Sequence, residues 1–256
     1  MSAVAVGARE RHRLLGEAYD PMTVDNLART GVGPGWRCLE VGAGDGGVAA
    51  WLDRRVAPGG RVDATDVRPD PQAAGPPVAR HDIVRDPLPD GGYDLVHARL
   101  VLRLLPERDR VLGRLVRALR PGGVLQLDEF DASAAPALRV PSPAARELYD
   151  AFTAAKNRLM ARAGVDVAFG RRAVRAMVAA GFTEVVARSR VEVWDAESPG
   201  LRLLAHHSRH LRDGLVREGM TPARLDEVRE LLADPRFRAR SYTMYSVQGR
   251  RPREVR

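Results

Sequence analysis

Short apolar runs alternate with amphipathic segments of helical period through the first half of the chain. This alternation predicts parallel strands joined by helices, an α/β sheet that is doubly wound, with helices on both faces. We expect strands at 37–41, 61–66, 78–83, 93–97, 124–127, 183–194 and 241–247. We expect helices at 8–19, 23–30, from a glycine-rich turn to about 56, and at 107–119, 144–162, 170–180, 200–217 and 222–232.

Residues 38–47 read Cys-Leu-Glu-Val-Gly-Ala-Gly-Asp-Gly-Gly, in which a strand runs into a glycine-rich turn and a helix start. Glycines let backbone N–H groups approach a ligand, and the helix start adds a partial positive charge. The turn fits two patterns. Gly42, Gly44 and Gly47 match the dinucleotide pattern G-x-G-x-x-G, whereas Gly42, Gly44 and Gly46 match G-x-G-x-G.

Glu40, two residues before the first glycine, favours one cofactor class over the other. A carboxylate repels a pyrophosphate but attracts an ammonium or sulfonium group, both of which S-adenosylmethionine carries. Arg68 keeps the alternative open, because an arginine after the second strand suits a 2′-phosphate and thus an NAD(P)-dependent oxidoreductase.

Three segments resemble the class I S-adenosylmethionine-dependent methyltransferases that act on small molecules. These are 39–46, the fourth-strand segment Gly-Tyr-Asp-Leu-Val-His-Ala-Arg at 92–99, and Leu-Arg-Pro-Gly-Gly-Val-Leu at 119–125. Together they span about residues 37–130. The resemblance implies a Rossmann-like sheet of seven strands, mostly parallel with the last antiparallel, and a helical lid after the fifth strand.

Four segments follow from this comparison and from the three prolines that interrupt residues 132–143. We expect an N-terminal helical cap at 1–30 and an S-adenosylmethionine-binding core at 31–131. A helical lid at 132–169 and a C-terminal part at 170–256, which completes the sheet with additional helices, would follow.

Polar residues end the expected strands, where ligands of such sheets bind. Asp66 lies about twenty residues beyond the glycine turn, a spacing that suits a carboxylate accepting both ribose hydroxyls. In the family, Asp82 would accept from the adenine amino group and Ile83 would cover the ring. The predicted cofactor-binding residues are Tyr19, Glu40, Gly42, Ala43, Gly44, Gly46, Asp66, Val67, Asp82, Ile83 and His97.

His97 and Glu129 are the candidate catalytic residues, since a general base helps when the acceptor's pKa requires one. His97 could equally shape the methionine pocket, and Asp128 could take the role of Glu129 in orienting an amine or hydroxyl. On the lid, Tyr149, Phe152 and Asn157 are candidate substrate contacts, although the spacing of Phe152 also suits the core. His206 and His210 have metal-ligand spacing without a partner motif, so we expect no metal.

The amino-acid composition limits the kinds of binding partner that we expect. The chain of 256 residues has a net charge of +8, but its arginines are scattered among acids and Lys156 is its only lysine, which indicates the coding bias of a GC-rich bacterium. We therefore expect a cytoplasmic enzyme with a specialised metabolite as small-molecule acceptor, without nucleic acid or membrane partners. An RNA methyltransferase and a non-enzymatic cofactor-binding module remain alternatives. Acceptor identity, methylation at N, O or C, and oligomeric state are not specified by the sequence.

Overall fold

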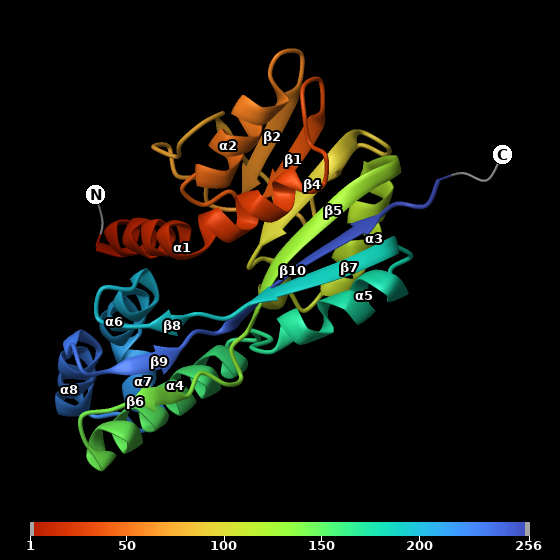
Figure 1. The fold of residues 1–256 in the computed structure, drawn as a ribbon. Coiled ribbons are helices and arrows are strands. Elements are labelled where there is room, and N and C mark those ends of the chain that lie inside the picture. The colour runs from red at the N-terminus through yellow and green to blue at the C-terminus, as the bar shows by residue number, and fades with distance from the viewer. Residues whose placement is uncertain (1–2, 254–256) are drawn as a thin grey trace. The chain divides into compact units, whose positions relative to one another are not determined.

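The computed structural model describes residues 3–253, except the side chains of residues 3–6 and 8 (Figure 1). Its helices are α1 (Ala3–Ala28), α2 (Gly47–Val56), η1 (Leu102–Leu104), α3 (Arg108–Ala118), α4 (Pro143–Arg162), η2 (Phe169–Arg172), α5 (Ala173–Ala179), α6 (Pro199–His210), α7 (Arg212–Arg217) and α8 (Pro222–Ala233). Its strands are β1 (Arg37–Val41), β2 (Arg61–Asp66), β3 (Val78–Arg80), β4 (Tyr93–Arg99), β5 (Leu119–Asp131), β6 (Ala137–Arg139), β7 (Thr183–Arg190), β8 (Val193–Trp194), β9 (Arg238–Arg240) and β10 (Thr243–Arg250).

Two compact units make up the chain. Unit 1 comprises Met1–Tyr19, Asp131–Val167 and Val191–Thr243, and unit 2 comprises Asp20–Phe130, Ala168–Arg190 and Met244–Arg256. The four segments expected from the sequence stay a prediction. None of the described helices combines the length and the apolar character needed to cross a bilayer.

Unit 2 contains the predicted seven-stranded sheet, in the order β3-β2-β1-β4-β5-β10-β7. The pairs β2–β3, β1–β2, β1–β4 and β4–β5 are parallel, and the last strand, β10, runs antiparallel to β7. The Rossmann-like fold with an antiparallel late strand is therefore confirmed. The carboxyl ends of β1, β2, β4 and β5 meet along one edge, where the polar strand ends were expected to gather.

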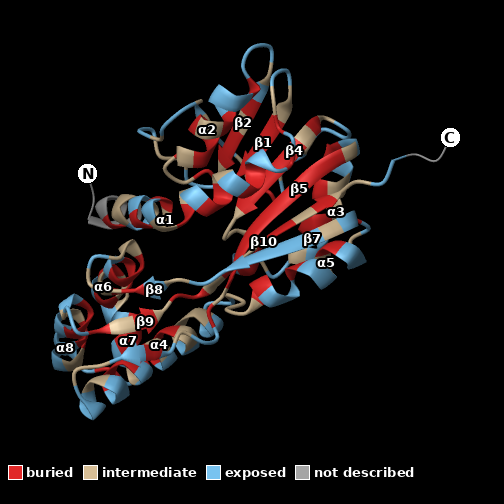
Figure 2. Cartoon of the chain, in the orientation of Figure 1, coloured by how far each residue is buried: buried red, intermediate tan, exposed pale blue. Residues whose placement is uncertain are grey.

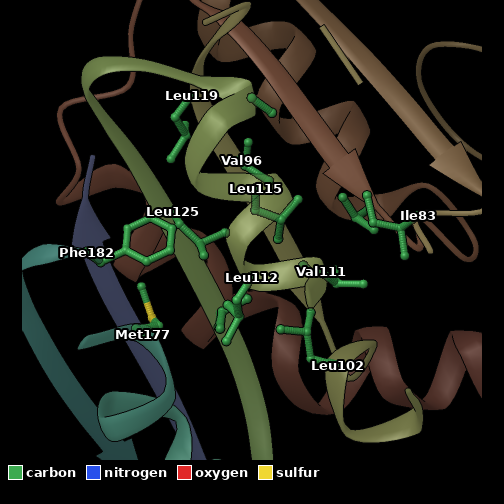
Figure 3. Packing of buried hydrophobic residues seen from close by; sticks show 14 of the residues in the cluster. Ile83, Val96, Leu102, Val111, Leu112, Leu115, Leu119, Leu125, Met177 and Phe182 are labelled. Atoms are coloured by element: carbon green, nitrogen blue, oxygen red, sulfur yellow. The ribbon is translucent and has the colours of Figure 1, made fainter. Parts of the chain in front are cut away.

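Apolar residues cover both faces of this sheet. On one face, α3 and α5 pack through Leu112, Leu115 and Met177 against Val96 and Leu125 (Figure 3). The opposite face packs against α2 and the C-terminal part of α1. Burial follows this layering, since β5 is buried along most of its length and the edge strand β7 is largely exposed (Figure 2). Side chains alternate between these faces along each strand.

Unit 1 contains a second sheet that the sequence pattern did not predict. It has the order β6-β9-β8, and both pairs are antiparallel. Its strands have two or three residues, too few to establish a period of two along the chain. The helices α4, α6, α7 and α8 belong to the same unit.

Several expected boundaries were wrong. One helix, α1, replaces the two expected at 8–19 and 23–30, and Pro21 lies inside it. Proline removes one helical hydrogen bond, but the buried Thr23, Asn26 and Leu27 beyond it continue to pack as a helix. The strand expected at 183–194 is divided into β7 and β8, which belong to different sheets.

Three further elements differ in extent. The helix expected at 200–217 is two helices, α6 and α7. β5 extends beyond the expected 124–127 at both ends. β3 ends at Arg80 rather than at residue 83, because Asp82 accepts from the Val84 N–H and begins a turn.

Candidate functional site

The glycine turn connects β1 to α2 with a left-handed backbone at three positions. Gly42, Gly44 and Gly46 have φ values of +72°, +58° and +81°, which side chains with a Cβ rarely adopt. The N–H groups of Gly42 and Ala43 both donate to the Thr65 carbonyl, at 2.8 and 2.9 Å. The turn is thereby anchored to the end of β2, beside Asp66.

Gly46 is held by close backbone packing as well as by its conformation. A Cβ there would lie 2.1 Å from the Ala74 carbonyl oxygen, and the Ala74 N–H is itself fixed by a 2.7 Å bond to the Asp45 carbonyl. Gly35 has the same φ of +81°, but a Cβ there would meet nothing within 4 Å. Alanine substitution at these two positions therefore distinguishes the cost of a left-handed backbone from the cost of steric overlap.

We expect Gly46→Ala to lower the free energy of unfolding by about 2–4 kcal/mol, because it adds overpacking to the left-handed penalty. Gly35→Ala, the matched control, should cost only about 1 kcal/mol. Urea denaturation followed by circular dichroism measures both. Equal losses of unfolding free energy in the two variants would show that the backbone at Ala74 moves to accommodate the added methyl group at no cost.

Asp66 is the last residue of β2, and its side chain holds the glycine turn through a hydrogen bond. Its Oδ2 accepts from the Gly44 N–H at 3.2 Å, and its Oδ1 accepts from the Arg68 N–H at 2.8 Å. The carboxylate is half-buried, so its oxygens keep access to solvent or a ligand. Val67 beside it is 52% exposed.

Asp82 and Ile83 have different surroundings. Asp82 is half-buried in a tight turn, where its backbone N–H donates to Asp86 and its Oδ1 accepts from Val84. Ile83 is only 4% exposed and packs within the hydrophobic cluster of unit 2 (Figure 3). Its side chain serves the core here, and its predicted contact with adenine stays a prediction.

Three ionisable side chains meet below the turn, on the sheet face that packs against α2. His97 Nδ1 lies 2.6 Å from Glu40 Oε2, and His97 Nε2 lies 3.1 Å from Asp128 Oδ2. The exposed fractions of Glu40, His97 and Asp128 are 2%, 0% and 0%. Glu40 and His97 are register partners on β1 and β4. We call these three residues the buried triad.

The buried triad holds an imidazolium between two acids. Burial alone would lower the pKa of His97, but the Glu40 and Asp128 carboxylates outweigh it and raise that pKa to about 9. Burial acts to raise the pKa of Asp128, yet hydrogen bonding to His97 lowers it overall. At neutral pH the buried triad therefore contains one cation and two carboxylates, leaving one net negative charge.

Asp128, rather than Glu129, is the acid of this strand end that contacts His97. Gln126 Nε2 donates to it at 3.2 Å, and the nearby Thr23 and Ser246 side chains act to lower its pKa. The signal was the strand period: residues 126 and 128 share a face with His97, whereas residue 129 points to the other face.

His97 has both ring nitrogens engaged by carboxylates. A protonated imidazole with two such partners offers no lone pair to an incoming proton. This geometry favours the alternative in which His97 holds neighbouring groups in position.

Glu129 lies on the opposite sheet face and is fully buried. Its Oε1 accepts from the backbone N–H of Leu102 at 2.8 Å and, at 3.4 Å, from that of Arg103, which anchors η1 after β4. Its Oε2 has no hydrogen-bond partner among the described residues. Burial raises the pKa of Glu129 to about 8, although the Arg103 charge acts in the opposite direction. Leu100, between β4 and η1, has a strained φ of +57°.

The remaining predicted site residues belong to unit 1. Tyr19 is buried in α1, and its predicted contact with the cofactor stays a prediction. On α4, Tyr149 and Phe152 are fully buried, and Asn157 Nδ2 donates to the Ala132 carbonyl at 3.0 Å. Phe152 thus packs as the core residue that its helical spacing also allowed.

Comparisons with known proteins place this geometry in context. A family described as "Methyltransferase domain" matches residues 7–168. The ubiquinone/menaquinone biosynthesis C-methyltransferase UbiE of Laribacter hongkongensis is 33% identical over 114 residues, which cover 41% of this chain and 47% of that protein. Methyltransferase str2 of Strobilurus tenacellus is 34% identical over 113 residues, covering 42% and 40%. The chain thus spans less than half the length of these curated relatives.

Solved structures share the fold over most of the chain. A putative methyltransferase from Bacillus halodurans has a TM-score of 0.56 at 16% identity, covering 90% of this chain and 98% of that one. The [4+2]-cyclase SpnF has a TM-score of 0.56 at 21% identity, covering 91% and 81%. At these identities the likeness concerns the fold alone.

Proposed function

We infer the function of this chain from its family, since it belongs to the class I S-adenosylmethionine-dependent methyltransferases. We propose that it transfers a methyl group to a nitrogen, oxygen or electron-rich carbon of a small-molecule acceptor, a specialised metabolite. The buried triad carries this proposal, because its net negative charge stands beneath the glycine turn, where a cationic cofactor needs it.

The residues present fit S-adenosylmethionine by their chemistry. Acidic side chains end β1 and β2 and follow β3, at Glu40, Asp66 and Asp82. Acceptors of this kind suit an ammonium group, a ribose diol and an exocyclic amine, respectively. A pyrophosphate would instead meet the buried triad's negative charge. We therefore assign Glu40 and the turn to the methionine end, Asp66 to the ribose, and Asp82 with Val67 to the adenine.

When bound, S-adenosylmethionine supplies an electrophilic methyl group on a positively charged sulfur. The protein's contribution is then chiefly position and exclusion of water. His97 acts as a positioning residue: its Nδ1 fixes the Glu40 carboxylate, while Asp128 holds its Nε2 on the other side of the ring. Glu129 is our candidate for accepting the acceptor's proton, because its Oε2 is unpartnered among the described residues.

The relatives support a small-molecule acceptor. The curated name of one matched protein states C-methylation in quinone biosynthesis, which places a ring carbon among the acceptor atoms to be tested. The solved cyclase with the same fold shows why turnover must be measured, since a fold does not determine its chemistry.

The test is release of S-adenosylhomocysteine, followed by mass spectrometry with hydroquinone, catechol, 4-hydroxybenzoate and benzylamine as acceptors. We expect release that depends on an acceptor. Its rate should rise with pH through about 8, where the folded-state Glu129 loses its proton. Glu129→Gln should lower this rate by about 10²–10⁴-fold and abolish its rise with pH.

The control is binding of S-adenosylhomocysteine, which Glu129→Gln should leave within about threefold of wild type, since Glu129 faces away from the buried triad. An unchanged rate in this variant would remove Glu129 from catalysis. Tight cofactor binding without product from any acceptor would favour the non-enzymatic module.

A further inference from the structure

Lys156 is the only lysine among 41 lysines and arginines, and it is buried in α4 with 5% exposure. Arginine stays charged in every protein environment, whereas a buried lysine offers a compact ammonium whose protonation can respond to a ligand. In a chain that uses arginine at every other basic position, a lysine in the interior of unit 1 points to a local chemical requirement.

An aromatic ring lies beside this ammonium. Lys156 Nζ lies 4.9 Å from the centre of the Tyr242 ring, which meets Trp194 edge-on at 5.8 Å. On the same helix as Lys156, Tyr149 packs against Phe237 with ring centres 5.1 Å apart. Aromatic residues are only 5% of the chain, so their gathering here is notable.

Tyr149 has unmet hydrogen-bonding capacity. The side chain is fully buried, and its hydroxyl has no hydrogen-bond partner among the described residues. Burial, together with the neighbouring Tyr242, raises the pKa of this hydroxyl, so it stays a donor. A buried hydroxyl without a partner is costly and indicates a ligand or an ordered water.

His207 on α6 faces the same ammonium. Its Nδ1 is buried without a hydrogen-bond partner among the described residues. Burial and, next, the Lys156 charge lower the pKa of His207 well below its usual value. The neutral histidine leaves Lys156 as the cation of this group. We call Tyr149, Lys156 and Tyr242 the lysine cluster.

We propose that the lysine cluster binds the anionic oxygen of an aromatic acid. The ammonium would pair with a carboxylate or phenolate, and the Tyr149 hydroxyl would donate to it. The rings of Phe237 and Trp194 would pack near the arene. Binding of such an acid is measurable without turnover.

A single lysine makes the test direct. Full-length protein labelled with ¹³Cε,¹⁵Nζ-lysine should give one side-chain signal, that of Lys156. We expect 4-hydroxybenzoate to shift this signal in a saturable manner, and the uncharged 4-hydroxybenzamide to leave it in place. No variant is needed, so failure of a mutant to fold does not affect this measurement.

Variants then locate the binding site. Lys156→Met should weaken 4-hydroxybenzoate binding by about tenfold or more, and Tyr149→Phe by about threefold to tenfold. Arg212→Met, which removes an exposed positive charge from the same unit, is the matched control and should change affinity less than twofold.

A Lys156 signal that ignores 4-hydroxybenzoate, or that responds equally to the benzamide, would overturn the proposal. So would wild-type affinity in Lys156→Met. Calorimetry with S-adenosylhomocysteine is run in parallel: loss of cofactor binding alone would contradict the proposed function, whereas loss of the acid response alone would contradict only the lysine cluster.

Discussion

Replacing His97 with alanine should lower the free energy of unfolding at pH 7 by about 3–5 kcal/mol, because two carboxylates then remain buried without their cation. In the folded protein His97 contacts Glu40 at 2.6 Å and Asp128 at 3.1 Å, and none of the three residues is more than 2% exposed. Chemical denaturation at pH 7 measures the loss.

The raised pKa of His97 also predicts how the stability of the wild-type protein depends on pH. The pKa of His97 rises from an ordinary 6.5 to about 9 on folding, so its contribution is fully present below pH 6.5 and is lost as pH rises through 9. We expect wild-type protein to lose about 3 kcal/mol over this interval. His97→Ala should not show this decline.

His81 provides the control histidine. It is half-buried in unit 2, and its Nε2 contacts only the Pro87 carbonyl among the described hydrogen bonds. His81→Ala should cost less than about 1 kcal/mol and keep the wild-type pH dependence. If His97→Ala were as stable as His81→Ala, the buried triad would not be the ion cluster described above.

Asp66→Ala should weaken binding of S-adenosylhomocysteine by about 100-fold, the second large effect we expect. It would remove the proposed acceptor of the ribose hydroxyls and also the oxygen that fixes the Gly44 N–H. Isothermal titration calorimetry measures the change. Asp63→Ala, on the same strand but paired with Arg37 and Arg61, should leave affinity within about threefold. Wild-type affinity in Asp66→Ala would reject the ribose assignment.

The alternation of strands and helices was predictable because it repeats over many segments of the chain, whereas the strand order is known only from the structure. Each of β1, β2 and β4 was expected within two residues of its end, and the polar residues that follow parallel strands necessarily meet at one sheet edge. The turn was equally readable, since alternating glycines at positions 42, 44 and 46 directly follow a short apolar strand.

Features that depend on tertiary packing were not predictable. Pro21 reads as a helix end, yet buried residues on both sides keep α1 continuous. The β6-β9-β8 sheet has strands too short to carry a period. Glu40 was interpreted as a lone carboxylate, and its pairing with His97 becomes visible only when the β1–β4 register is known.

Calorimetric titration of the wild-type protein with S-adenosylmethionine and with NADP⁺ tests the central claim most directly. A negatively charged cluster under the glycine turn predicts saturable, micromolar or tighter binding of the sulfonium compound and no heat from the dinucleotide. Uptake of NADP⁺ by a protein that ignores S-adenosylmethionine would contradict it.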